Sequence, residues 1–253
     1  MIGAAIDTAL YAYAVVGPVD AEIRAALPAP LELVGSAELA VVAGEVPLAE
    51  FGEDVLRERL NDREWLEEKA RAHDEVIQRL LPLTTVVPLR FGSIHRDRIA
   101  VEAFLERRHD ALAAALERVR GRVEVGVKIW LDRDQRPARG RQEAAATGRA
   151  YLEQRKRERE RAAVAATSLE EHLRDVHGRL LASAEDGVVN RPQSSELTGR
   201  DAEMVLNAAY LVPGDGGEFF AEVDRLRSER PELVFEATGP WAAYNFVDLG
   251  EGV

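Results

Sequence analysis

The chain has 253 residues, 46% of them hydrophobic, and a formal net charge of -12 at pH 7. This charge argues against binding of nucleic acid or an anionic membrane by the surface as a whole, and no apolar run approaches the ~18 residues of a membrane span. The absence of cysteine excludes disulfides, thiolate metal sites and cysteine nucleophiles, and because the chain shows no secretory signal we expect a cytoplasmic protein.

The first predicted strands are rich in β-branched and aromatic residues. Leu10 to Val16 carries aromatics at alternate positions, which favours a strand. Residues 31–34 and 39–46 are joined through Gly35-Ser36 and predict a hairpin. Between the first strand and this hairpin, the two prolines within residues 27–30 predict a loop.

The pattern then changes to the period of an α-helix. From Trp65 to Leu80 the apolar residues recur every three or four positions. Asn61 and Glu64 have the spacing of a capping box. We therefore expect a helix over about residues 62–81.

The stretch Thr85–His95 is predicted to be a strand followed by a turn. Pro88 cannot donate a hydrogen bond to a sheet, so we expect an irregularity there. Gly92 suggests a positive φ or the close approach of another segment. Arg90 and Phe91 lie at the strand end, where functional residues are often found; the alternative is a core strand with a bulge and a turn.

The order of the predicted elements suggests a fold. A second helix over about residues 101–119, stopped by Gly121, precedes a strand over 123–131 whose side chains alternate between apolar and mixed. The predicted order is one strand, then two strands, a helix, a strand, a helix and a strand. This order is typical of a ferredoxin-like, split β-α-β sheet. We expect residues 1–132 to form an N-terminal α+β domain with helices on one face and one face of the sheet exposed to water.

The remainder predicts a second, smaller α+β domain over residues 148–253. Residues 133–147 lack apolar periodicity and are predicted to be a flexible linker. A long helix begins near Gly148, and the first half of this helix is almost wholly charged. The predicted elements after it are a strand over 204–212, a helix over 218–230 and a strand over 233–237.

The segment from Arg133 to Arg161 is basic, with ten Lys or Arg residues against five acids. This could indicate a nucleic-acid site, but the acids interleave with the arginines, few aromatics accompany them and no recognition motif is present. Alternating charge along a helix usually marks a solvated face, although such a face could also dock an acidic partner protein. We expect no nucleic acid among the partners.

Catalytic interpretations have weak support. The pairs His73–Asp74 and His95–Asp97 could each be a base and its orienting carboxylate, but sequence adjacency does not establish that geometry. Residues 214–217 could be a phosphate-binding turn before a helix, although Asp215 would repel an anion there. We predict no cofactor, no metal and no enzymatic activity; the alternative is a cytoplasmic enzyme that binds a small ligand or a nucleotide.

Several sequence blocks together resemble the gas vesicle protein F/L family. The blocks are Trp65–His73, Val87–Gly92, Val125–Ile129, Gly148–Leu152, Leu206–Val212, and Thr238–Trp241 with Tyr244 and Phe246. They occur in the family's order and span nearly the whole chain. The chain departs from the family by carrying Ala242-Ala243 where a second proline often follows the glycine-proline-tryptophan block.

The resemblance implies a two-domain accessory protein in which a long helix leads into the C-terminal domain. It also implies a role in gas vesicle assembly through contacts with the small hydrophobic shell protein and other accessory proteins. Arg90, Phe91, Trp241 and Tyr244 are the candidate partner-binding residues, by strand addition or through an apolar groove. The alternative is that the three aromatics are core or interface residues and that Arg90 pairs with an internal acid such as Glu67 or Glu68.

Overall fold

A computed structural model describes residues 7–131, 148–194, 199 and 202–249. The contacts between residues divide the chain into two compact units. The first unit contains the chain up to Glu124 together with the segment from Pro240 onward. The second unit is the intervening part, from Val125 to Gly239. The two ends of the sequence therefore contribute to the same unit.

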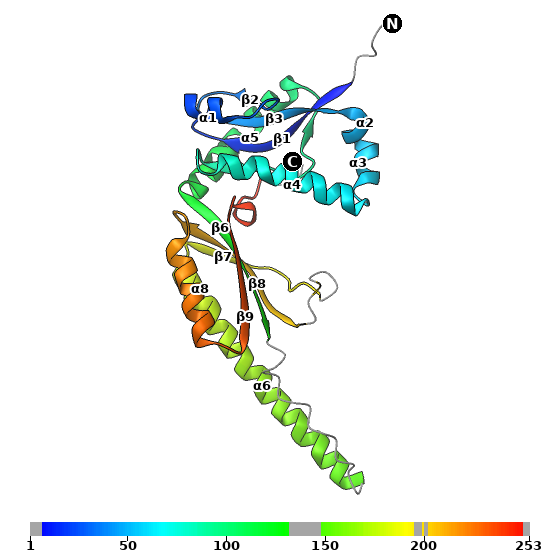
Figure 1. Cartoon of the computed structure of the whole chain (residues 1–253), viewed down its shortest axis with the longest axis vertical. Coiled ribbons are helices and arrows are strands. Elements are labelled where there is room, and N and C mark those ends of the chain that lie inside the picture. Colours follow the sequence, from blue (N-terminus) through cyan, green and yellow to red (C-terminus); the bar gives the residue numbers. More distant parts are fainter. Residues whose placement is uncertain (1–6, 132–147, 195–198, 200–201, 250–253) are drawn as a thin grey trace. The chain divides into compact units, whose positions relative to one another are not determined.

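The first unit is built on an antiparallel sheet (Figure 1). Its strands are β1 (Thr8–Val16), β2 (Glu32–Gly35), β3 (Ala40–Pro47), β4 (Val86–Pro88) and β5 (Ile94–His95). The order is β2-β3-β1-β4, and β5 also pairs with β1. The hairpin expected from residues 31–34 and 39–46 is confirmed as the β2–β3 pair.

The helices of the first unit are α1 (Ala21–Ala26), α2 (Leu48–Phe51), α3 (Glu53–Arg59), α4 (Arg63–Leu80) and α5 (Arg98–Val119). α4 and α5 confirm the two helices expected from the apolar period. The expected cap at Asn61 was wrong by one residue, because the Asp62 side chain accepts the hydrogen bond from the Trp65 backbone N–H at 3.2 Å. The short helices α1, α2 and α3 were not expected, since none is long enough to repeat an apolar stripe.

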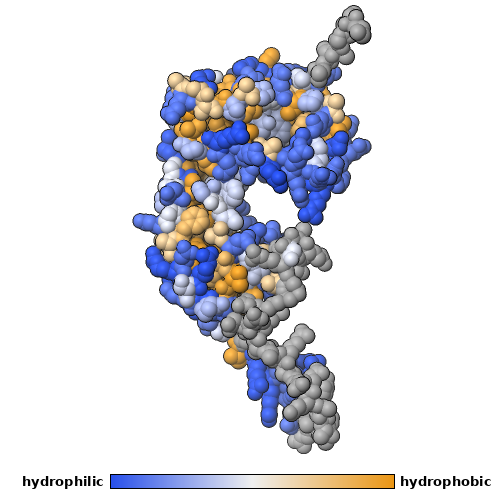
Figure 2. Space-filling model, viewed as in Figure 1, coloured by the Kyte–Doolittle hydropathy of each residue, from blue (hydrophilic) through white to orange (hydrophobic). Residues whose placement is uncertain are grey.

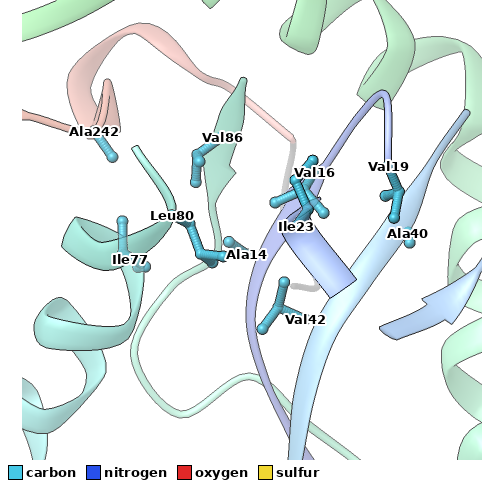
Figure 3. Close-up of a cluster of buried hydrophobic side chains, with 10 residues drawn as sticks. All are labelled: Ala14, Val16, Val19, Ile23, Ala40, Val42, Ile77, Leu80, Val86 and Ala242. Carbon is cyan, nitrogen blue, oxygen red and sulfur yellow. The ribbon is translucent and has the colours of Figure 1, made fainter. Parts of the chain in front are cut away.

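Helices α1 and α4 cover one face of this sheet. Figure 3 shows their side chains pointing toward those of β1 and β3. The cluster includes Ala14, Val16, Ile23, Val42, Ile77 and Leu80, each at most 2% exposed. Burial of apolar area contributes about 25 cal/mol per Å², so this layer fixes α4 on the sheet.

Helix α5 packs on the opposite face. Leu10 and His95 are ladder partners in β1 and β5, so their side chains point the same way, and that of Tyr11 points the other way. The His95 ring lies 5.3 Å from that of Phe104 in α5. The Tyr11 ring lies 5.6 Å from that of His73 in α4. The expectation that the helices share one face therefore holds for α1 and α4 but not for α5.

The second unit contains another sheet. Its strands are β6 (Arg122–Leu131, which begins at the end of the first unit), β7 (Asp186–Val189), β8 (Met204–Pro213) and β9 (Leu233–Trp241), with helices α6 (Gly148–Ala182) and α8 (Gly217–Glu229). The strand order is β7-β8-β6-β9. The elements of this unit thus follow the order β-α-β-β-α-β, with β6 and β8 in the centre of the sheet.

Strand β6 corrects two expectations. It was assigned to the first sheet, but it pairs in the second, while β1, α1, β2, β3, α4 and β4 already complete a split β-α-β arrangement in the first. It was also expected to be half-exposed, yet Trp130 is buried along with Val127 and Ile129, as befits a central strand. The units therefore differ from the expected domains of 1–132 and 148–253, and the expected linker over 133–147 lies outside the described residues.

Helix α6 is held in the second unit near its C-terminal end. The Arg179 Nε donates to Glu222 of α8 at 2.8 Å, and the His177 Nδ1 lies 2.7 Å from the hydroxyl of the buried Tyr210. The part of α6 farther from α8 is mainly hydrophilic in Figure 2. None of the helices in the described ranges has both the length and the apolar content needed to cross a membrane.

Shortening a side chain in the layer under α4 should destabilise the first unit. Ile77 is fully buried there, so we expect Ile77→Ala to lower the free energy of unfolding by about 2–5 kcal/mol. The matched control is Ile99→Ala on α5, where the side chain is 73% exposed and the change should stay within about 0.5 kcal/mol. Urea denaturation of both variants measures the free energy of unfolding. A similarly small decrease in both variants would show that α4 does not depend on this layer.

Candidate functional site

Helix α4 forms one wall of a groove on the first unit. Its buried residues Trp65, His73, Ile77 and Leu80 recur at the helical spacing that turns one stripe toward the sheet. The neighbouring positions are thereby left on the surface. The groove has a volume of about 810 Å³ and is lined by Ala70, Arg71, His73, Asp74, Glu75, Gln78, Arg79, Phe91, Trp241 and Tyr244.

A tight turn after β4 brings Phe91 to this wall. The backbone N–H of Ser93 and its hydroxyl both donate to the Arg90 carbonyl, at 3.1 and 2.7 Å. Gly92 has a φ of 83°, which confirms the positive φ expected there. The irregularity expected in the strand at Pro88 is not seen in its pairing with β1, which runs without a shift from Val86 to Pro88; the register shift lies in β1 itself, between Ala12 and Ala14 in its pairing with β3.

Phe91 is half-buried in an aromatic cluster that joins the turn to α4 and β1. Its ring lies 6.0–6.3 Å from those of Tyr11, Trp65 and His73, each time edge to face. Such arrangements suit the aromatic quadrupole and contribute about 0.5–1.5 kcal/mol per pair beyond area burial. The structural interpretation of Phe91 therefore has support, and the same ring also lines the groove.

A hydrogen-bonded chain runs beneath this cluster. The Gly92 backbone N–H donates to the Tyr11 hydroxyl at 3.0 Å, and that hydroxyl lies 3.0 Å from Nδ1 of His73. A hydroxyl that accepts from Gly92 can donate its own proton to an unprotonated Nδ1, so the contact suits a neutral imidazole. Burial lowers the pKa of His73 and raises that of Tyr11, which favours the neutral form of both groups.

The opposite wall is the end of β9 with the segment that follows it, and from Pro240 onward this part of the chain belongs to the first unit. The buried carboxylate of Glu124 accepts from the backbone N–H of Asn245 at 2.8 Å and from its side-chain amide at 2.6 Å. Burial raises the pKa of Glu124, while both Asn245 donors favour its charged form. Arg118 donates to the carbonyl of Phe246 at 3.2 Å, and Arg108 donates to that of Leu249.

These contacts position two aromatic side chains that line the groove. Trp241 is 36% and Tyr244 is 38% exposed, although both lie next to the fully packed Ala242 and Ala243. The Tyr244 hydroxyl donates to the Asp74 carboxylate at 3.3 Å, which ties this wall to α4. Burial, and then the Asp74 charge, raises the pKa of Tyr244.

The groove brings together three of the four residues expected to bind a partner, namely Phe91, Trp241 and Tyr244. Arg90 is exposed on the turn beside them. The proposed pairing of Arg90 with Glu67 or Glu68 is absent from the described contacts, since these acids lie 2.7 Å from Arg63 and 3.4 Å from Lys69.

The polar residues of the α4 wall were missed in the sequence. They could have been found from the charged positions that flank the apolar stripe, since Arg71, Glu75 and Arg79 recur at four-residue intervals. Glu124 was also missed, because the alternation of apolar and other residues along this strand assigned its side chain to the solvent-exposed face of the sheet. The residues around Glu124 in the sequence, such as the buried Val125, do not indicate that a segment more than a hundred residues later in the chain covers the carboxylate.

The two His–Asp pairs are engaged in structural contacts. His73 contacts Tyr11, while Asp74 accepts from Tyr244. Asp97 caps α5 by accepting from the Ala100 N–H at 2.9 Å. Among the described residues, no group of three or more His, Asp or Glu side chains has a geometry that could hold a metal ion.

The turn before α8 has the geometry of a capped helix start. Gly216 has a φ of 80° and supplies no side-chain hydrogen bond. The Asp215 carboxylate accepts from the Gly217 N–H at 2.9 Å. A negative side chain thus occupies the position at which a phosphate-binding turn would hold its ligand.

The neutral state of His73 should make the first unit sensitive to mild acid. Because its folded pKa lies below the unfolded value of about 6.5, only the unfolded chain gains a proton as the pH falls through that value, so the free energy of unfolding falls. We expect urea denaturation to show lower stability at pH 5.8 than at 7.5, and His73→Gln to reduce the difference. The exposed His109→Gln is the control and should leave the difference unchanged; an equal effect of both variants would contradict the assignment.

Comparison with known proteins identifies the family. The family model described as gas vesicle synthesis protein GvpL/GvpF matches residues 9–248. Gas vesicle protein L of Streptomyces sp. (strain CB03234) is 39% identical over 258 residues, covering 97% of this chain and 95% of that protein. Gas vesicle protein F1 of Halobacterium salinarum (strain ATCC 700922 / JCM 11081 / NRC-1) is 26% identical, covering 96% and 94%.

Solved structures show the same fold at low sequence identity. The crystal structure of gas vesicle protein GvpF from Anabaena sp. PCC7120 matches with a TM-score of 0.68 and 17% identity, over 96% of this chain and 98% of that chain. GvpF from Microcystis aeruginosa matches with a TM-score of 0.62 and 17% identity, over 95% and 99%. From the family model and the sequence relatives, this chain belongs to the gas vesicle synthesis protein GvpL/GvpF family.

Proposed function

We propose that this chain is a non-enzymatic accessory protein of gas vesicle assembly that binds the small hydrophobic shell protein during nucleation or growth of the vesicle. It acts in the cytoplasm and at the gas vesicle, where it also contacts other accessory proteins. Membership of the GvpL/GvpF family supports the assembly role. A shell subunit that polymerises through apolar surfaces would aggregate without an escort, which gives such a protein a physical purpose.

The observation that carries the binding proposal is the pair of exposed aromatics, Trp241 and Tyr244, in a groove of about 810 Å³. Large aromatics normally bury most of their area, and interface hot spots are rich in Trp and Tyr. Both residues lie on a segment held by Glu124, Arg118 and Arg108, so little backbone order has to be gained on binding. The groove is therefore our candidate for the contact with the shell protein.

Arg90 has a secondary place in this proposal. Its side chain is exposed on the turn that also carries Phe91, and it forms no ion pair with any residue in the described ranges. A guanidinium at the edge of an aromatic groove can contact a partner's carboxylate or backbone carbonyl. Charges on the rim of an interface mainly affect association rate and salt dependence, so the contribution of Arg90 should be smaller than that of Trp241.

The non-enzymatic part of the proposal is supported by the use of the candidate catalytic pairs. His73, Asp74 and Asp97 are all engaged in contacts that hold the fold together. A ligand-binding enzyme would be stabilised by its ligand, so a thermal melt with nucleotides and divalent cations tests the alternative. An increase in melting temperature with any of them would favour the enzyme.

Capture of the shell protein should depend on Trp241. Co-expression with the gas vesicle shell protein, followed by co-purification, is expected to keep the shell protein soluble with the wild-type chain. Trp241→Ala should reduce the captured amount at least about tenfold, because a central aromatic anchor contributes about 2 kcal/mol or more. Ile99→Ala removes a more exposed apolar side chain on α5 and should capture normally.

Thermal melts of both variants distinguish a lost contact from a lost fold. An unchanged melting temperature together with lost capture supports the groove as the contact site. Arg90→Ala should then reduce the captured amount by a smaller factor, and this reduction should become smaller still at high salt. Normal capture by Trp241→Ala would exclude the groove as the site of contact. No capture even by the wild-type chain would show that the shell protein is not its direct partner.

A further inference from the structure

One side of the groove carries a row of alternating charge. Arg71, Glu75 and Arg79 line it and are all exposed. Four residues of helix rise about 6 Å, so the row presents plus, minus and plus at that interval along α4. Residues of opposite charge at this spacing commonly pair with each other. In the part of the chain that the structure describes, these three side chains form neither an ion pair nor a hydrogen bond.

The charges next to this row behave differently. Arg63 pairs with Glu67 at 2.7 Å one turn earlier on the same helix. Lys69, on another side of α4, pairs with Glu50 at 3.0 Å. The unpaired charges of α4 that line the groove thus follow directly on paired ones. The pKa of Glu67 is lowered first by its hydrogen bond to Arg63 and to a lesser degree by the charge of Arg71, but its ion pair is with Arg63 and it does not line the groove.

The walls of the groove favour one mode of peptide binding. Strand addition needs a sheet edge with free backbone donors and acceptors. Here the lining consists of α4 side chains together with Phe91 on one wall, and of Trp241 and Tyr244 on the other. Such a surface instead suits a helix that lays an apolar stripe into the groove.

We infer that the groove accepts an amphipathic helix of the partner, whose apolar stripe packs on the three aromatics and whose flank carries acid, base and acid at four-residue intervals. That flank would meet Arg71, Glu75 and Arg79 in turn. This inference rests on the proposed function and specifies which kind of segment the partner supplies. The charge row selects the partner and fixes its register, while the aromatics contribute most of the affinity.

Two synthetic helical peptides test this selection. Each has about 18 residues, enough to form a helix in water, and the same leucine stripe. One carries Glu, Lys and Glu at four-residue intervals beside the stripe, and the other carries Lys, Glu and Lys. Fluorescence anisotropy of labelled peptide should show about tenfold tighter binding of the first, since each exposed pair contributes little and three act together.

Charge reversal in the protein gives the complementary test. The variant Arg71→Glu/Glu75→Arg/Arg79→Glu should reverse the preference between the two peptides by a similar factor. The control exchanges the paired charges one turn away, Arg63→Glu/Glu67→Arg, and should keep the wild-type preference. Equal binding of both peptides, binding of neither, or an unreversed preference in the triple variant would overturn the inference.

Two further measurements separate the inference from the function on which it rests. If the triple variant captures the shell protein as well as wild type while Trp241→Ala does not, the groove still binds its partner and the helical, charge-matched partner is excluded. If both variants capture normally, the groove is not the contact site and the inference fails while shell-protein binding stands. If the wild-type chain captures no shell protein, the proposed function fails as well. Sedimentation of the wild-type chain must show a monomer, because a dimer lost in the triple variant would mean that a second copy occupies the groove.

Discussion

The groove depends on the contacts that hold the last described segment of the chain against the first unit, and the only buried acidic group among them is Glu124. Glu124 accepts two hydrogen bonds from Asn245, and these bonds hold the last described segment of the chain against the first unit. Without them a buried carboxyl group would be left without hydrogen-bond partners, which costs about 1–3 kcal/mol. Trp241 and Tyr244 take their places from this segment, and the Tyr244 hydroxyl reaches Asp74 from there. The chemistry of the groove therefore originates outside the groove itself.

Both units use the same order of elements around a sheet, although their helices differ greatly. In the first unit the crossover after β1 is the six-residue helix α1, whereas in the second the crossover after β6 includes the 35-residue helix α6. The sheet order survives this difference because it is set by strand pairing, while a crossover only has to return the chain to the sheet. The long helix is free to extend beyond the sheet and present charge to solvent.

Much of this architecture could be predicted from the sequence, because the signals are local. The apolar period gave α4 and α5, the hairpin of β2 and β3 followed from Gly35-Ser36, and Gly92 indicated its positive φ. Sheet membership could not be predicted in this way, because the alternation of β6 fits either sheet equally well. Phe91, Trp241 and Tyr244 were singled out as partner-binding candidates, and they line one groove; the contact of Tyr244 with Asp74 could not be predicted, because the two residues are 170 positions apart. No short-range pattern contains that information.

The order of the chain has a consequence during synthesis. More than a hundred residues, forming the second unit, separate Glu124 from Asn245. At about 5–20 residues per second, the ribosome makes Glu124 roughly ten seconds before its partner exists. A nascent chain that has already folded its first sheet therefore still lacks one wall of the groove. Only a chain that has been synthesised beyond Asn245 can present this surface complete, whatever else of it is already folded.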